Sequence, residues 1–132
     1  MKIILSIKPE FANKIFDGTK KFEFRRLLFK NKNVKNVVVY ASAPISKVIG
    51  EFEIETILHK DLNSLWSKTS KFSGISEEYY LKYFIGKKDG YAIKVKNPIK
   101  YETELCIKET FGLNAPQSFA YIKQSTKAQQ SA

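Results

Sequence analysis

The stretch GTKKFEFR, residues 18–25, decides how this chain is expected to fold. Its first residue, Gly18, ends a short helix that begins at Pro9. Proline suits the first turn of a helix, and glycine suits the position after the last turn. The two phenylalanines then alternate with charged residues, which is typical of a half-buried strand over about 20–27. The stretch therefore predicts a helix, one tight turn and a strand in direct succession.

The same stretch gathers charges of both signs. Lys20 and Lys21 are adjacent, Glu23 and Arg25 follow at alternate positions, and Arg26 comes directly after them. Because like charges side by side repel, this clustering is costly for a segment that only has to form a strand. In a chain of formal net charge +10, we interpret the cluster as a candidate site for an anionic ligand.

The chemistry of this candidate site depends on one geometric condition. Lys20 and Arg25 are five positions apart, which in a regular strand places them on opposite faces. They converge only if Lys20 lies in the turn before the strand or if the strand bulges. Neighbouring cations lower the pKa of an ammonium group, which would make Lys20 a base or a nucleophile near neutral pH. Glu23 shares a face with Arg25 and would orient the reacting groups.

A plainer hypothesis treats these charges as the outer face of a sheet. The carboxylates of Glu51, Glu53 and Glu55 alternate along a later strand and would pair with the cations of residues 20–26. Exposed pairs of this kind contribute about 0–1 kcal/mol and imply no function. The sequence leaves both hypotheses open.

Composition bounds the class of protein. A length of 132 residues with 43% hydrophobic residues predicts one globular domain over residues 1–122, followed by a polar, disordered tail over 123–132. The excess of 23 lysines and arginines over 13 acids favours a polyanionic partner, although a lysine-rich surface alone would also explain it. The local bias is stronger, because residues 20–35 hold seven cations and one acid.

Several kinds of chemistry are not expected. One cysteine and one histidine, Cys106 and His59, do not provide a disulfide, a metal site or a catalytic triad. No glycine-rich phosphate loop is present, so we expect neither a metal nor another cofactor. The brief apolar run at the N-terminus is too short for a signal peptide or a membrane span, which leads us to expect a soluble, cytoplasmic protein.

The remaining chain alternates strands with short helices. Strands are expected over about 3–7, 37–41, 46–58, 91–97 and 101–107, with a break at Pro98. Helices are expected over 61–69 and from Ser76 onward, and residues 108–122 are expected to form a helical turn and a docking segment. This order predicts an α+β fold, in which a small mixed or antiparallel sheet of about six strands closes toward a barrel with short helices inserted between the strands.

The chain resembles the ASCH domain family of the PUA-like superfamily. The family pattern Gly-x-Lys-x-x-x-x-Arg is matched by Gly18, Lys20 and Arg25. The lead-in SIKPEFANKIFDGTKKFEFRR and the later segments GISEEYYLKYFIGKKDGYAIKV and FGLNAPQSFAYI are also similar to one branch of that family, so the likeness covers residues 3–122. The resemblance implies a compact PUA-like β-barrel whose cleft, lined by the matched lysine and arginine, holds RNA or a nucleotide.

The resemblance also implies alternative activities. Some ASCH proteins hydrolyse N4-acetylcytidine with the matched lysine, a threonine three residues later and a downstream glutamate, whereas others are ribonucleases or RNA-binding regulators. Here the threonine position holds Glu23, and Glu77 is the nearest candidate for the downstream glutamate. The candidate catalytic residues are therefore Lys20, Glu23 and Glu77. The candidate ligand-binding residues are Lys8, Gly18, Lys20, Lys21, Arg25 and Arg26.

Three hypotheses of function follow from the sequence. The first is a module that binds RNA, a nucleotide or a modified nucleoside, with spare aromatic residues such as Tyr79, Tyr80 and Tyr83 available for stacking, although their helical spacing is also typical of a core. The second is a small lysine-dependent hydrolase, either a nucleoside amidohydrolase or a ribonuclease. The third is a protein-interaction domain with a degenerate cleft, whose partner docks on the loop at 27–36.

Overall fold

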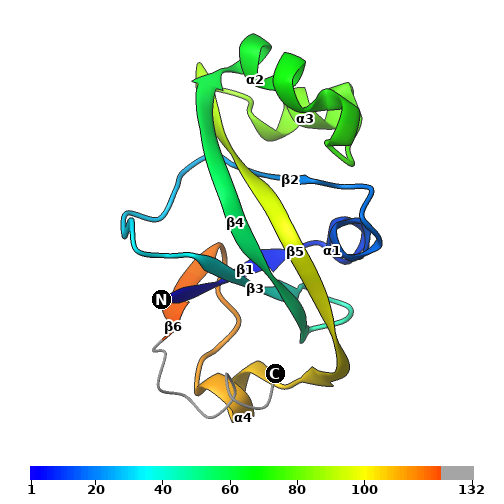
Figure 1. Ribbon diagram of the computed structural model, residues 1–132, viewed down its shortest axis with the longest axis vertical. Coiled ribbons are helices and arrows are strands. Elements are labelled where there is room, and N and C mark those ends of the chain that lie inside the picture. Colours follow the sequence, from blue (N-terminus) through cyan, green and yellow to red (C-terminus); the bar gives the residue numbers. More distant parts are fainter. Residues whose placement is uncertain (123–132) are drawn as a thin grey trace.

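The computed structural model describes residues 1–122, and the tail expected at 123–132 lies outside this range. Strands and short helices alternate along the described chain (Figure 1). Their bounds are β1 Lys2–Ile7, α1 Pro9–Asp17, β2 Phe22–Arg25, β3 Asn36–Ala41, β4 Lys47–Asp61, α2 Leu62–Thr69, the 3-10 turn η1 Ser70–Phe72, α3 Glu77–Tyr83, β5 Asp89–Leu105, α4 Ile107–Phe111 and β6 Phe119–Ile122. The α+β class predicted from the sequence is confirmed.

The described strands form one mixed sheet of six, in the order β2-β5-β4-β3-β1-β6. β1 and β3 run parallel, and the other neighbouring strands pair antiparallel. The expected closure into a barrel is not found, because β2 and β6 stand at opposite edges of an open sheet. β2 is only four residues long, and it meets the β6 side through the side chains of Arg25 and Ser118 rather than through a backbone ladder.

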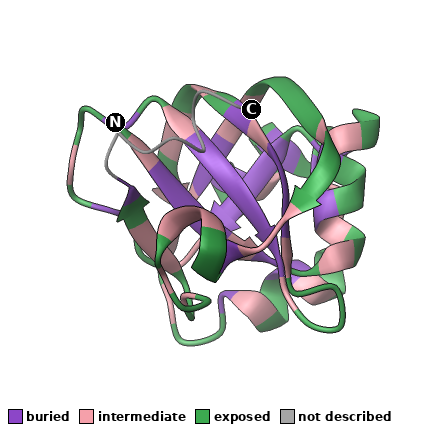
Figure 2. Cartoon of the chain, turned by 90° about the horizontal axis from the view of Figure 1, so that it is seen from below, coloured by how far each residue is buried: buried purple, intermediate pink, exposed green. Residues whose placement is uncertain are grey.

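The core lies on both faces of the central strands, which Figure 2 shows as the buried middle of the molecule. Alternate residues of β1 and β3 point to opposite faces, and all but the first residue of β3 are buried, as the continuous apolar run at 37–41 predicts. One face packs on α1 through Ala12 and Ile15, and the other packs on Ile107 of α4. Full burial of each large aliphatic side chain stabilises the fold by about 1.5–3 kcal/mol.

The predicted strand break at Pro98 is wrong, since β5 continues through this residue. Glu51 pairs with Ile99 and Glu53 with Lys96, so two residues of β5, Asn97 and Pro98, stand opposite one residue of β4. Such a bulge accommodates a proline, which has no N–H to donate to the ladder.

The long hairpin of β4 and β5 carries α2 and α3 at its far end (Figure 1). Each helix begins at the cap that the sequence predicts: a carboxylate oxygen of Asp61 accepts from the Ser64 N–H at 3.1 Å, and the Ser76 hydroxyl accepts from the Tyr79 N–H at 3.0 Å. α3 then packs against β2, where the ring of Phe24 contacts those of Tyr80 and Phe84. This packing places α3 beside the charged stretch at 18–25.

Candidate functional site

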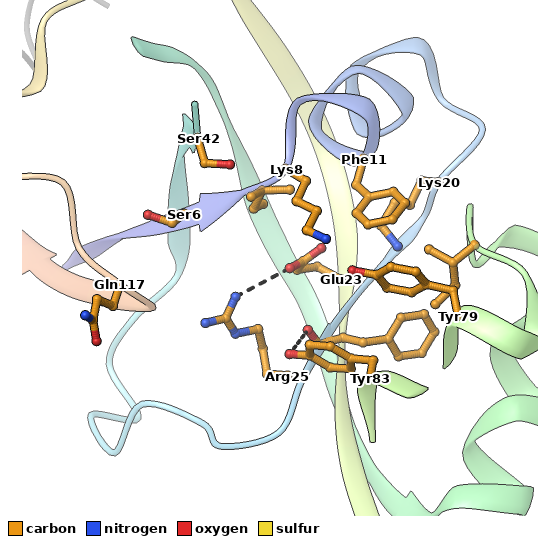
Figure 3. A pocket seen from close by; sticks show the side chains of 13 residues that line it. Ser6, Lys8, Phe11, Lys20, Glu23, Arg25, Ser42, Tyr79, Tyr83 and Gln117 are labelled. Carbon is orange, nitrogen blue, oxygen red and sulfur yellow. Dashed lines mark hydrogen bonds and ion pairs between the residues drawn. The ribbon is translucent and has the colours of Figure 1, made fainter. Parts of the chain in front are cut away.

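A cavity of about 340 Å³ lies where β1 ends, beside β2 and α3 (Figure 3). Its lining comes from the first 25 residues, from the position after β3, from α3 with the loop before it, and from the segment before β6. The residues are Ser6, Ile7, Lys8, Phe11, Lys20, Glu23, Phe24, Arg25, Ser42, Ile75, Tyr79, Tyr83 and Gln117. Its volume and its mainly apolar walls with a few polar groups are typical of small-ligand sites.

Lys20 is the most deeply buried cation of the cavity, with 2% of its surface exposed. Its ammonium donates to the carbonyl oxygen of Ser73 at 2.5 Å and lies over the rings of Phe24 and Phe11, at 5.0 and 5.5 Å from their centroids. Burial, only partly offset by the carboxylate of Glu23, lowers the pKa of Lys20 to about 8. At pH 7 the Lys20 side chain is then unprotonated in about one molecule in ten.

The loop between η1 and α3 holds Lys20 in this position. The Phe72 carbonyl accepts from the Lys21 N–H at 2.8 Å, so the loop is joined to the chain directly after Lys20. At Gly74, which has a φ of +69°, an added Cβ would lie 2.7 Å from both Cβ and Cγ of Lys20. Only a glycine therefore lets the loop lie against the lysine stem. Nothing in the composition of this loop marks it as part of a site.

Glu23 and Arg25 approach the cavity from alternate positions of β2, as the period of a strand requires. Glu23 is 7% exposed and pairs with the Arg25 guanidinium at 3.6 Å. Burial raises the pKa of the Glu23 carboxyl, although Lys20 and Arg25 counteract the effect. Arg25 also donates to the hydroxyl of Ser118.

The hypothesis of a charged outer face is wrong for this stretch, because Lys20 and Glu23 are buried. The carboxylates of the later strand have other partners: Glu51 binds Lys2 and the Tyr101 hydroxyl, Glu53 accepts from Asn97, and Glu55 pairs with Lys94 at 2.8 Å. The burial of Tyr101 and its hydrogen bond to Glu51 also raise the pKa of that phenol.

Lys20 and Arg25 line the same cavity because β2 begins only at Phe22, which leaves Lys20 in the turn before the strand. This is one of the two conditions under which residues five apart converge. Figure 3 shows Lys8, Lys20 and Arg25 directed from three places toward the space around Glu23. The cavity thus combines three cations with one carboxylate.

Of the other predicted residues, only Lys8 belongs to this cavity. Lys8 lines the cavity, and its ammonium lies 5.3 Å from the centre of the Tyr79 ring. Gly18 ends α1 outside the cavity, and Lys21 is exposed and lies over the ring of Phe72 at 4.5 Å. Arg26 donates to the carbonyl oxygens of Tyr83 and Ile85 at 2.8 Å each. Glu77 is exposed at the start of α3 and does not line the cavity.

The tyrosines of α3 have different roles according to their position on the helix. Tyr79 and Tyr83, four residues apart, line the cavity, whereas Tyr80 and Phe84, one position further on, are buried in the core. The Tyr80 hydroxyl donates to the Leu62 carbonyl at 2.7 Å, and burial raises the pKa of this phenol to about 12. Helical spacing alone does not distinguish the two faces when both are aromatic.

Three residues that no sequence motif marks, Ser6, Ser42 and Gln117, add polar groups to the wall opposite α3. They come from three distant segments that the sheet brings together. The segment before β6 is fixed by the Ser6 hydroxyl, which donates to the Pro116 carbonyl at 2.5 Å, and by the Ser6 N–H, which donates to Ser118.

This arrangement is suited to a ligand that is both anionic and planar. Cations bind phosphate or carboxylate oxygens, aromatic rings stack on a flat group, and hydroxyl and amide groups recognise its edge. Within residues 1–122, no group of three or more histidine, cysteine, aspartate or glutamate side chains is arranged to hold a metal ion. No helix in the same range is long and apolar enough to cross a membrane.

Known proteins similar to this chain include one that the match covers over most of its length. An ASCH domain-containing ribonuclease from Zymomonas mobilis is 31% identical over 126 residues, which cover 92% of this chain and 84% of that protein. The large ribosomal subunit protein uL22 of Ureaplasma parvum serovar 3 is 32% identical over 121 residues, but this chain spans only 39% of the length of that relative.

Solved protein structures also resemble the structure of this chain. A crystal structure of ASCH from Zymomonas mobilis superposes with a TM-score of 0.88 and 29% identity, over 98% of this chain and 91% of the other. The N-terminal domain of Staphylothermus marinus McrB, at 12% identity and a TM-score of 0.56 over 93% of this chain and 88% of the other, shares the fold. The pattern of the ASCH domain matches residues 5–104, which confirms the resemblance seen in the sequence, and the chain therefore belongs to the ASCH domain family.

Proposed function

We propose that this protein binds RNA, with one nucleotide in the cavity of about 340 Å³ and its phosphate between Lys20 and Arg25. The observation that carries the proposal is that these two cations, one from a turn and one from a strand, line one hollow with aromatic walls. The phosphate would receive charge-assisted hydrogen bonds, which are stronger than those between neutral groups.

Other features support an RNA ligand over a simple anion. Phe11, Tyr79 and Tyr83 provide ring surfaces for a base, and base–aromatic stacking contributes about 1–3 kcal/mol. The net charge of +10 attracts a polyanion. The ribonuclease from Zymomonas mobilis acts, by its name, on RNA, and it shares 31% of its aligned residues with this chain.

Fluorescence anisotropy with a labelled single-stranded RNA tests this proposal. Lys20→Met keeps an apolar stem of similar length but removes the ammonium, and it should weaken binding by about tenfold or more, because a hydrogen bond to a charged group contributes about 1.5–3 kcal/mol. Lys108→Gln, an exposed position on α4, changes the net charge by the same amount and should leave the affinity close to that of the wild type.

Log K for the wild type should also fall linearly with log salt concentration, because phosphate binding releases counterions. Equal affinities of wild type and a folded Lys20→Met variant would contradict the proposal, as would an affinity that salt does not change. The absence of any RNA affinity would instead favour the protein-interaction hypothesis.

A second candidate function is cleavage of the bound RNA, which the lowered pKa of Lys20 and the raised pKa of Glu23 specifically favour. Unprotonated Lys20 would take the proton from a 2′-hydroxyl, whose oxygen attacks the adjacent phosphorus. The bond from phosphorus to the 5′-oxygen then breaks, and protonated Glu23 would supply the proton that this oxygen needs. Arg25 would stabilise the charge that develops on the phosphoryl oxygens.

This mechanism yields a 2′,3′-cyclic phosphate and a 5′-hydroxyl, and it requires the 2′-hydroxyl at the cleaved bond. Lys20→Met should abolish cleavage, and a substrate with a 2′-deoxy sugar at that position should be resistant. Full activity of the variant, or equal cleavage of the deoxy substrate, would exclude the mechanism. Hydrolysis of N4-acetylcytidine is less well supported, since Glu23 replaces the threonine and Glu77 lies outside the cavity.

A further inference from the structure

A second cavity, of about 310 Å³, adjoins the first along the C-terminal end of β2. Its lining consists of Arg25, Arg26, Leu27, Tyr83, Lys87 and Ser118. Arg25 and Tyr83 line both cavities, so the two hollows meet at these side chains. The first cavity contains the carboxylate of Glu23, whereas the second is lined by three cations and no acid.

One cation of the second cavity, Arg26, is held in place by neutral groups. The Arg26 guanidinium donates hydrogen bonds to the carbonyl oxygens of Tyr83 and Ile85. These acceptors carry no net charge, so they leave its positive charge uncompensated. None of the ion pairs found within residues 1–122 includes Lys87 or Arg26. Two cations outside these ion pairs, Arg26 and Lys87, therefore line a concave surface together with Arg25, which pairs with Glu23. Such a surface attracts an anion, because its walls focus the field.

An exposed apolar side chain lines the same cavity. Leu27, which lines it, is 72% exposed, and Ile85, whose carbonyl binds Arg26, is 74% exposed. Exposed apolar surface beside a cluster of cations matches a nucleotide, which combines a charged phosphate with a flat base and a largely apolar sugar edge. A free inorganic anion would use the cations but not this surface.

We infer that the second cavity is a subsite for the next phosphate of an RNA strand, so that the ligand is single-stranded RNA of at least two nucleotides rather than a mononucleotide. This inference rests on the function proposed above. The strand would place one base in the first cavity, pass Arg25 and Tyr83, and place the following phosphate between Arg26 and Lys87. A base surrounded by side chains cannot remain paired, and RNA-binding proteins usually recognise such unpaired bases.

Isothermal titration calorimetry with uridine 5′-monophosphate, uridine 3′-monophosphate and oligouridylates of two to four nucleotides, each carrying a 5′-phosphate, tests the inference. The wild type should bind the dinucleotide about tenfold or more tightly than either mononucleotide, because one further phosphate meets charged donors. In Lys87→Gln this affinity ratio should fall several-fold, and the slope of log K for the tetranucleotide against log salt should decrease in magnitude by about 0.7. Lys108→Gln, which makes the same change of charge on α4, should keep the ratio and the slope of the wild type.

The possible outcomes separate the two proposals. A wild type that binds mononucleotides and dinucleotides equally, with both affinities reduced by Lys20→Met, overturns the second subsite but keeps the first. A ratio that Lys87→Gln and Lys108→Gln lower to the same extent also overturns the second subsite, since net charge alone then explains it. A wild type that binds no uridylate of any length overturns the proposed function together with this inference.

Discussion

Replacing Gly74 by alanine should destabilise the protein and disturb the candidate site at once. A new Cβ at this position would lie 2.7 Å from Cβ and Cγ of Lys20 and 2.9 Å from its Cδ. These atoms belong to the buried stem of the lysine and not to its flexible end, so the side chain cannot avoid the clash by changing its last torsion angle. Either the loop at 72–75 or Lys20 itself must move.

The expected cost has two parts. A left-handed backbone costs an alanine about 1–2 kcal/mol, and overpacking of a filled site costs about 1–3 kcal/mol. The free energy of unfolding should therefore fall by about 2–5 kcal/mol. At about 4 °C for each kcal/mol in a domain of this size, Tm should fall by about 8–20 °C.

Gly112 provides a matched control, because it has the same φ of +69° but an added Cβ would have no atom within 4 Å. Gly112→Ala should lose only the backbone part, about 4–8 °C in Tm. Thermal unfolding followed by circular dichroism measures both variants, and RNA affinity measured well below Tm should fall only in Gly74→Ala. Equal losses of Tm in the two variants would refute the close packing of the loop on Lys20.

Two further predictions concern the groups around the cavity. Since the pKa of Lys20 is about 8 in the folded state and about 10.5 in the unfolded state, the unfolded state binds more protons between these values, and stability rises with pH there. In urea unfolding, the free energy of unfolding of the wild type should rise by about 1.6 kcal/mol relative to that of Lys20→Met between pH 8 and 9.5. Parallel curves for the two proteins would contradict the lowered pKa. Tyr79→Leu should weaken RNA binding by about 1–3 kcal/mol with little change of Tm, whereas Tyr80→Leu, in the core, should lower Tm; the reverse pattern in melting and anisotropy measurements would contradict the assignment of the two faces of α3.

Local patterns predicted the elements well wherever the signal was a cap or a run of apolar residues. Pro9 and Gly18 bound α1 as expected, and Asp61 and Ser76 cap the two helices that follow them. The error at Pro98 arose because a bulge requires a partner strand, and the position of the partner is not contained in the local sequence. The closure of the sheet was overestimated for the same reason, since strand order depends on pairing between distant segments.

The sequence by itself determined the family, the α+β class, the order of helices and strands, and the presence of a charged turn and strand at 18–25. These properties depend on neighbouring residues, whose spacing along the chain is their spacing in the helix or strand. Only the tertiary structure decided that Lys20 and Glu23 are buried rather than exposed, and that Tyr79 faces the cavity while Tyr80 enters the core. Burial and the resulting pKa shifts depend on which distant segments pack against a side chain, here the loop at 72–75 on Lys20, and that packing is a property of the whole fold.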